Sequence, residues 1–163
     1  MSQRLVIDCP SFAREAKSLQ GDLPIASLTR TLDLLADSAG VIGYRIEGRM
    51  GERHRPQLIL RVEGVLSLSC QRCLEGISYP LRLENTLEFV VDEEDLTQEE
   101  IEDDSRDFLP AQAEVDVLAL IEDEIILGLP SVPRHECCAL PERAREMQPA
   151  SPFSVLGSLK GKA

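Results

Sequence analysis

The chain has 163 residues, a formal net charge of −12 and few aromatic side chains, with four Phe, two Tyr and no Trp. This length most simply forms a single domain over residues 1–163, whose core must be built mainly from Leu, Ile and Val. No apolar run reaches the roughly 18 residues that span a bilayer, and the N-terminus lacks the features of a signal peptide, which argues against a membrane protein and predicts a cytoplasmic location.

Two helices are expected in the first forty residues. Ser11 is a candidate N-cap for the first helix, which would continue through Leu19 and end at Gly21. Proline in a first turn, followed by a one-sided apolar pattern, predicts a second helix. This helix would begin at about Pro24, and one face of it would hold Ile25, Leu28, Leu32 and Leu35.

Three strands are predicted by the alternation of apolar and polar residues over 41–48, 58–68 and 81–91. Gly64 interrupts the second strand and indicates either a bulge or a close approach of two backbones. Because each strand has one apolar face, helices must cover the sheet. The prediction is an α+β fold: an antiparallel sheet, open or barrel-like, with N-terminal helices and a C-terminal apolar helix.

Acidic residues gather in the second half of the chain. Residues 92–107 hold ten acids and one Arg. Such a run repels itself, so an acidic flexible segment is expected at about 92–110, with an acidic docking segment as the alternative. Residues 1–82 carry eleven Lys/Arg against nine Asp/Glu, whereas residues 83–163 carry six against twenty. This balance favours basic protein partners over non-specific nucleic-acid binding.

An apolar helix is predicted over residues 117–129. Its apolar residues lie nearly all round, which indicates a central helix or a partner surface. Glu122 falls within the main apolar stripe, and Glu124 lies among apolar neighbours on another face. Buried carboxylates are costly unless they are paired, so Arg72 is a candidate partner for one of them.

Residues after this helix are expected to form an extended connector and tail over about 130–163. Prolines stand at four positions between residues 130 and 150. In the tail, Phe153, Leu156 and Leu159 recur every three residues after Ser151 and Pro152, as in one amphipathic turn. So short a turn is marginal alone and would dock either on its own domain or on a partner.

The five cysteines argue against a disulfide framework, because their number is odd and two of them are adjacent. Cys70 and Cys73 form a CxxC pair after a predicted strand. Zinc could be held by this pair together with two of three later residues: His135, Cys137 and Cys138. The second group lacks the usual two-residue gap, so reduced and partly buried thiols are the favoured interpretation. A redox motif is disfavoured, because no helical pattern follows the CxxC.

Basic residues concentrate around the predicted hairpin tip at residues 50–57. An RNA contact there would use five arginines: Arg45, Arg49, Arg53, Arg55 and Arg61. No aromatic residues are interleaved for stacking on bases, which argues against sequence-specific readout. A solvated hairpin is the favoured interpretation.

No enzymatic activity is predicted. The chain has two histidines, and neither stands in a triad-like or metalloprotease context. A glycine-rich phosphate loop is also missing from the sequence.

Three stretches together resemble the family of large ribosomal RNA subunit accumulation proteins, the YceD family. They are CQRCLE from Cys70, EVDVLALIEDEIILGLPSVPRHECC from Glu114 and SPFSVLGSLK from Ser151. The positions that match the family pattern include Cys70, Arg72, Cys73, Leu74, Glu75, Asp116, Glu122, Glu124, Pro130 and Pro133.

This resemblance implies a non-enzymatic ribosome biogenesis factor that supports the synthesis, processing or stability of 23S rRNA. It brings no catalytic residue with it. The expected partners are basic ribosomal or rRNA-processing proteins, with direct RNA contact through the arginine patch as a further option. The alternative is a small zinc- or thiol-containing protein-binding module that is unrelated to ribosomes.

Overall fold

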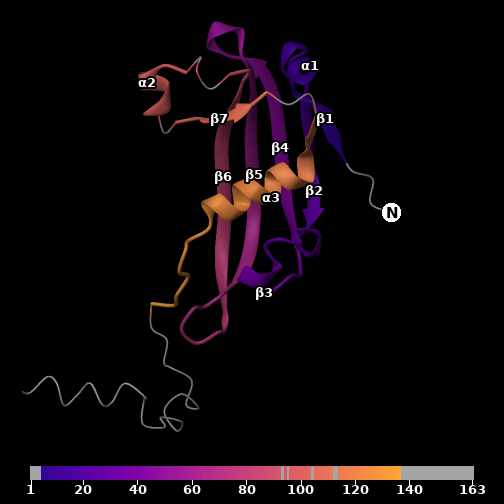
Figure 1. The fold of residues 1–163 in the computed structure, drawn as a ribbon. Coiled ribbons are helices and arrows are strands. Elements are labelled where there is room, and N and C mark those ends of the chain that lie inside the picture. Colours follow the sequence, from indigo (N-terminus) through magenta and orange to yellow (C-terminus); the bar gives the residue numbers. More distant parts are fainter. Residues whose placement is uncertain (1–4, 93, 95, 104, 112–113, 137–163) are drawn as a thin grey trace, which may run out of the picture.

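The computed structural model describes residues 5–92, 94, 96–103, 105–111 and 114–136. Its main feature is a sheet in which neighbouring strands follow the order β2–β4–β5–β6–β7, with β3 paired to β5. The bounds are β2 Ser18–Pro24, β3 Leu35–Asp37, β4 Val41–Met50, β5 Pro56–Ser69, β6 Gly76–Val90 and β7 Asp107–Pro110. The long strands β4, β5 and β6 lie side by side (Figure 1).

The remaining elements are short except for one helix. A separate strand pair joins β1, Val6–Asp8, to β8, Glu114–Asp116, in antiparallel orientation. The helices are α1 Cys9–Arg14, α2 Gln98–Ile101 and α3 Val117–Gly128, and short 3₁₀ turns lie at Ile25–Ser27, Leu32–Leu34 and Glu52–His54.

The three strands predicted from alternation are confirmed as β4, β5 and β6. Ile42 and Ile46 of β4 are completely buried, whereas the intervening Arg45 is exposed on the other face. The buried set continues across the sheet with Leu58, Leu60, Val62, Leu66, Leu68, Leu81 and Leu87. Period-two burial therefore gives the sheet one apolar face, as alternating side chains require.

Gly64 marks a close approach and not a bulge. Its pairing with Leu81 lies within an unbroken register between β5 and β6. A Cβ atom at this position would lie 2.7 Å from Cγ2 of Ile42, so a larger residue would collide with β4. Of the two explanations that the sequence offered, the steric one is correct.

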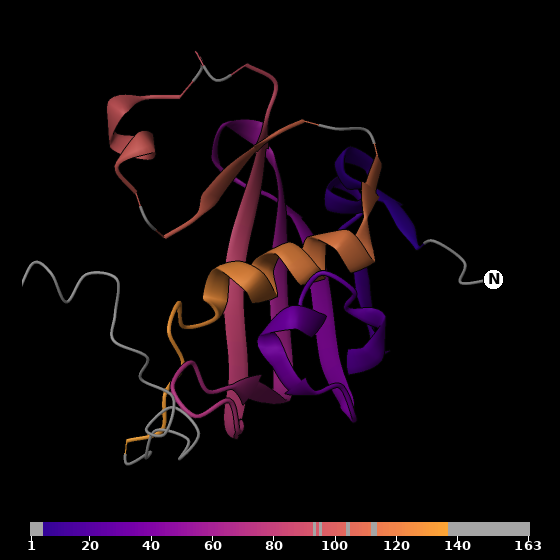
Figure 2. The ribbon, with the colours of Figure 1, turned by 60° about the horizontal axis from the view of Figure 1, so that its bottom comes forward.

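Helix α3 covers the apolar face and runs across the strands (Figure 2). Asp116 caps it by accepting hydrogen bonds from the backbone N–H groups of Leu118 and Ala119, at 3.0 and 3.2 Å. Ile121 and Ile125 are fully buried against the sheet. The predicted helix is thus confirmed, and Leu127, which is 75% exposed, shows that one side of it faces solvent.

The expected first helix is wrong in its bounds. Asp8, and not Ser11, is the N-cap of α1, because its carboxylate accepts the Ser11 N–H at 2.7 Å. The chain leaves the helix after Arg14, and Ala16 adopts a left-handed φ of 49°. Residues 18–24 then pair with β4 as a strand, so sheet pairing outweighs local helical pattern there.

The expected second helix, from Pro24 to Leu35, is also absent from the structure. Two single 3₁₀ turns and strand β3 occupy this span. Ile25 and Leu28 are buried in the core, but Leu32 is 37% exposed. Two residues of the predicted stripe therefore anchor an irregular segment in the core. A helical wheel cannot distinguish such anchors from the buried face of a helix.

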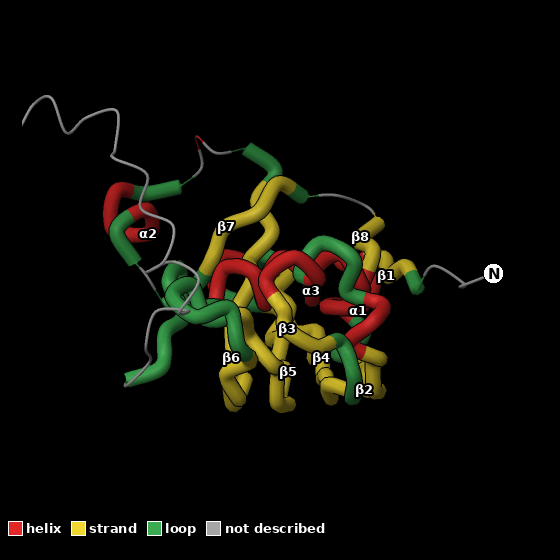
Figure 3. Tube along the Cα trace, turned by 90° about the horizontal axis from the view of Figure 1, so that it is seen from below, coloured by secondary structure: helices red, strands yellow, loops and turns green. Residues whose placement is uncertain are grey.

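The fold is α+β, dominated by strands, and the sheet does not close into a barrel. β2 and β7 stand at its two edges, and β7 pairs with β6 in parallel, so the sheet is mixed and not purely antiparallel. Viewed as in Figure 3, α1 and α3 lie on one side of the long strands, and no helix of the described residues lies on the other. No described helix has the length and apolar character that a bilayer crossing requires.

The acidic span at about 92–110 contains regular structure. Helix α2 begins at a capping box, in which Thr97 and Glu100 satisfy each other's backbone N–H groups, and β7 follows. Residues 130–136 form neither helix nor strand. The predicted amphipathic turn in the tail lies outside the described residues.

Candidate functional site

The CxxC pair lies on a tight turn directly after β5. The Cys70 N–H donates to the Glu75 carbonyl at 2.9 Å, and the Leu74 N–H donates to the Cys70 carbonyl at 2.9 Å. Leu74 adopts a left-handed φ of 65°, which closes the turn before β6 begins. The β5–β6 hairpin therefore presents Cys70, which is buried, and Cys73, which is partly buried, at one end of the sheet.

The connector after α3 returns to this turn and brings a histidine to the two thiols. The Gln71 N–H donates to the Pro133 carbonyl at 2.9 Å, which fixes the connector beside the turn. Nδ1 of His135 then lies 3.4 Å from Sγ of Cys73. The ligand atoms of Cys70, Cys73 and His135 all lie within 4.8 Å of one another. We call these three residues the thiol–imidazole cluster.

The electrostatics of the cluster favour a thiolate. Burial opposes ionisation of the Cys70 thiol, but backbone N–H groups of Cys73, His135 and Arg72 hydrogen-bond to its sulfur and lower its pKa to about 5. Interaction with Cys70 is the main cause that raises the pKa of His135. Nε2 of His135 lies 3.2 Å from the Gly76 carbonyl, a contact that suits an Nε2–H donor, so Nδ1 is the ring nitrogen that faces the thiols.

This geometry joins three of the five predicted metal ligands. Cys137 and Cys138 lie outside the described residues, so the structure does not place a fourth ligand. Two thiolates and one imidazole are a donor set that zinc prefers, and the Gly76 contact is the kind of second interaction that orients a ligating histidine. The turn leads into strand β6 and not into a helix, so it lacks the helix N-terminus typical of redox CxxC motifs.

Arg72 is not the partner of either buried carboxylate, which corrects the prediction from sequence. Arg72 is exposed on the CxxC turn. Glu122 accepts a hydrogen bond from the Arg30 backbone N–H, and Glu124 accepts one from Nδ2 of Asn85 at 2.8 Å. The carboxylates on α3 are instead satisfied by the irregular 25–34 span and by β6.

The other positions of the family pattern fall into two regions. Leu74 and Glu75 are exposed on the CxxC turn, and the Pro133 carbonyl holds the connector against that turn. Asp116 caps α3, and Pro130 follows its end. The pattern therefore traces the turn, the covering helix and the connector that links them.

The predicted arginine patch divides into two groups. On the open face of the sheet, Arg61 contacts Glu47 at 2.6 Å and Glu84 at 3.1 Å, and Arg45 contacts the same Glu47 at 2.8 Å. Hydrogen bonding from Arg61 is the main cause that lowers the pKa of Glu47. These two arginines are thus neutralised within the sheet, and the remaining three lie at the hairpin tip between β4 and β5.

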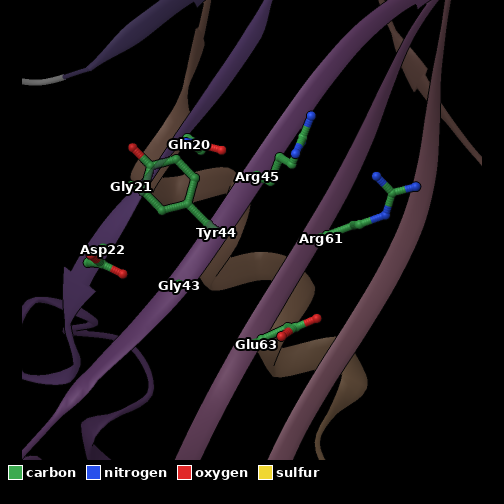
Figure 4. A pocket seen from close by; sticks show the side chains of 8 residues that line it. All are labelled: Gln20, Gly21, Asp22, Gly43, Tyr44, Arg45, Arg61 and Glu63. Atoms are coloured by element: carbon green, nitrogen blue, oxygen red, sulfur yellow. The ribbon is translucent and has the colours of Figure 1, made fainter.

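Arg45 and Arg61 also border a hollow on this open face (Figure 4). The hollow lies over Gly43, which contributes no side chain, and its other lining residues are Gln20, Gly21, Asp22, Tyr44 and Glu63. Its charges are of both signs and largely matched, so the hollow itself indicates no particular ligand.

Sequence reasoning missed a buried ionic cluster beneath the hairpin tip. Glu88 of β6 is only 1% exposed and lies 3.3 Å from Arg55 and 3.3 Å from Arg106. Gln57 donates a further hydrogen bond to it. Glu88 occupies an outward position in the alternation of β6, so the pattern predicts a solvated side chain. In the folded chain Arg55 and Gln57 of the β4–β5 hairpin and Arg106, just before β7, contact it instead.

Comparison with known proteins finds a matching family model and a similar protein. The family model for "Large ribosomal RNA subunit accumulation protein YceD" matches residues 58–160. A protein of that name from Haemophilus influenzae is 33% identical over 151 residues, which cover 80% of this chain and 78% of the relative. No solved structure matches the chain.

Proposed function

The chain belongs to the family of large ribosomal RNA subunit accumulation proteins, YceD, and from this premise we propose that it is a non-enzymatic factor in the production of the large ribosomal subunit. Its role would be to support the synthesis, processing or stability of 23S rRNA in the cytoplasm. The single observation that carries this proposal is the family match over residues 58–160, which includes the thiol–imidazole cluster and α3.

A binding role agrees with the distribution of acidic side chains, of which the buried ones make contacts within the fold. Glu122 and Glu124 tie α3 to the rest of the fold, and Glu88 sits in an ionic cluster. Residues 83–163 carry six basic against twenty acidic side chains. That surplus suits basic ribosomal or rRNA-processing proteins as partners, while the hairpin tip is the place where a direct RNA contact would be made.

The first experiment measures the ratio of 23S to 16S rRNA in cells that lack this chain, with and without a plasmid copy. A fall in 23S that the copy reverses supports the proposal. An unchanged ratio under several growth conditions contradicts it. Sedimentation adds a second test, because a factor in assembly should travel with large-subunit precursors. A binding module unrelated to ribosomes should not.

We propose further that the thiol–imidazole cluster binds a structural zinc ion. Cys70, Cys73 and Nδ1 of His135 would be ligands, and the ion would fasten the connector to the CxxC turn. The convergence of three ligand atoms within 4.8 Å favours zinc over unligated thiols. When bound, zinc would supply structural crosslinking.

Metal analysis of the purified full chain tests this second proposal. We expect about one zinc per chain, lost in Cys73→Ser and in His135→Ala. Cys9→Ala is the matched control, because Cys9 is a buried thiol outside the cluster and its removal should leave the metal content unchanged. Zinc-free wild-type protein, or equal zinc in all variants, contradicts the proposal.

A further inference from the structure

The tip of the β4–β5 hairpin is an ordered, arginine-bearing turn. The Gly51 N–H donates to the Arg55 carbonyl at 2.8 Å, and Arg53 and His54 have left-handed φ values of 55° and 58°. These constraints fix the backbone from which Arg53 and Arg55 project. Arg49, at the end of β4, is exposed beside them and donates to Gln57.

One carboxylate of the acidic segment lies between two of these arginines. Oε2 of Glu100 is 3.2 Å from Nη1 of Arg53, and Oε1 is 3.0 Å from Nη1 of Arg55. Figure 1 shows α2, which carries Glu100, at the same end of the sheet as the hairpin tip. Phosphate can be bound by the same arrangement, in which two guanidinium groups contact two oxygens of one anion.

The helix is positioned for this contact by its own cap. Glu100 accepts hydrogen bonds from the Thr97 backbone N–H at 2.9 Å and from its hydroxyl at 3.1 Å. The Thr97 N–H is the first cause of the lowered pKa of Glu100, and Arg55 and Arg53 add to it, so the carboxylate is charged at neutral pH. After the helix, Arg106 contacts Asp103 at 3.0 Å and leads the chain into β7.

Exposure separates the two arginines. The side chain of Arg53 is 52% exposed, whereas that of Arg55 is only 12% exposed beneath α2. A ligand at the tip would meet Arg49 and Arg53 first, and would gain Arg55 only by displacing Glu100. The neighbouring Glu99 is exposed, and no contact to the tip is found for it among the described residues.

We propose that the hairpin tip binds the phosphate backbone of RNA and that Glu100 is an internal competitor for the same guanidinium groups. This rests on the proposed function in ribosome production, and it adds a regulation: RNA binds where enough phosphates are presented together to displace α2. Weakly charged or isolated anions would leave the helix in place. The tip reads charge and not base sequence, because no aromatic side chain accompanies the arginines.

The test compares Glu100→Gln with Glu99→Gln in the full chain. Both variants raise the net charge by one, but only Glu100→Gln removes a charge that contacts the tip. Its amide oxygen can still accept the Thr97 N–H bond of the capping box, so the helix keeps its cap. The probe is a fluorescent 20-nucleotide oligouridylate, titrated at several salt concentrations. Glu100→Gln should bind several-fold more tightly than Glu99→Gln. The magnitude of its salt slope should also rise by roughly 0.7, since Arg55 adds one phosphate contact and each such contact on a single strand contributes about 0.7.

A second pair of variants locates the effect. Adding Arg53→Ala to Glu100→Gln should remove the gain, whereas adding Arg61→Ala should not, because Arg61 lies on the open sheet face with Glu47 and Glu84. Thermal unfolding of each variant confirms that it is folded. Equal effects of Glu99→Gln and Glu100→Gln would overturn the proposal, since bulk charge would explain both.

Two other outcomes would also overturn it. One is the absence of RNA binding in every variant. The other is binding of a basic peptide, such as oligolysine, that both glutamine variants weaken equally, because α2 would then be an acidic docking site for protein. Neither outcome touches the rRNA ratio measured in cells, so failure of the internal competitor and failure of the proposed function can be told apart.

Discussion

Glu124 is a buried carboxylate whose surroundings oppose its charge. Burial is the main cause that raises its pKa above the ordinary 4.5, Asn85 lowers it through a hydrogen bond, and the charges of Asp107 and Asp123 raise it further. The folded chain therefore holds this proton more tightly than the unfolded chain does. It follows that the contribution of Glu124 destabilises the fold at neutral pH, and that this cost disappears as the pH falls below 4.5.

Glu124→Gln should accordingly raise the midpoint of thermal unfolding near neutral pH. The amide keeps an oxygen that can accept the Asn85 hydrogen bond, while it removes the buried charge. The advantage over wild type should shrink as the pH is lowered through the raised pKa and vanish below 4.5. Calorimetry over a pH series measures this, with the exposed Glu99→Gln as control. A variant that is less stable at neutral pH would contradict the interpretation.

Two glycines of β4 provide a matched steric test. A Cβ atom at Gly48 would lie 2.5 Å from the Phe12 carbonyl oxygen, whereas one at Gly43 would lie 3.6 Å from Asp22, an ordinary contact. Gly48→Ala should therefore destabilise the fold by about 1–3 kcal/mol through overpacking. Gly43→Ala should change stability by less than about 0.5 kcal/mol. Urea unfolding distinguishes them, and equal effects would mean that α1 shifts freely from β4.

Helix α3 shows which predictions succeed at the scale of an element. Its apolar residues predict both its existence and its start at Val117 correctly, because the apolar pattern of a helix is a local property, and the structure adds Asp116 as its cap. Alternation likewise identifies β4, β5 and β6. The span 18–24 also alternates, with Leu19 and Leu23 packed against the core, yet the local sequence pattern predicts the end of one helix at Gly21 and the start of another at about Pro24. There the outcome depends on an edge of β4 that only the folded sheet provides.

The thiol–imidazole cluster shows the same difference between local features, which the sequence predicts, and long-range contacts, which it does not. Sequence spacing names Cys70, Cys73 and His135 as candidates, since CxxC geometry is local. The meeting of His135 with the pair depends on the Gln71–Pro133 hydrogen bond and on how α3 directs the connector. Long-range contacts of this kind, like the pairing of Glu124 with Asn85 in place of Arg72, leave no signal in a single sequence.

The two sides of α3 should differ in their effect on stability. Ile125 is fully buried against the sheet, and Leu127 is 75% exposed. Ile125→Ala should cost about 2–5 kcal/mol, since it removes buried methyl groups and leaves a cavity. Leu127→Ala should stay within about 0.5 kcal/mol. Chemical denaturation provides both values. A large loss of stability for Leu127→Ala would show that its side is packed in solution, for example against another part of the chain.

For the whole molecule, the region that the family model matches is shorter than the folded unit, which includes strands that precede it. The matched region starts at residue 58, just inside β5, which lies between β4 and β6 in the sheet. The first 55 residues supply β2 and β4 on one side of β5. They also supply much of the core beneath α3, including Phe12, Ile25, Leu28, Ile42 and Ile46. A chain without them would expose the apolar face of β5 and its entire β4-facing edge.

A fragment of residues 56–163 should therefore fail to unfold cooperatively in urea, whereas the full chain should show one sigmoidal transition. A full chain cleaved at an inserted protease site between Glu52 and Arg53 is the control. It keeps both pieces and breaks only the hairpin tip, so it should remain assembled and retain a transition. The fragment retains α3 and the CxxC turn but leaves β5 as an unpaired edge, which favours aggregation. Cooperative unfolding of the fragment alone would show that β6, β7 and α3 suffice to bury β5, and that the N-terminal strands are an addition to an independent unit.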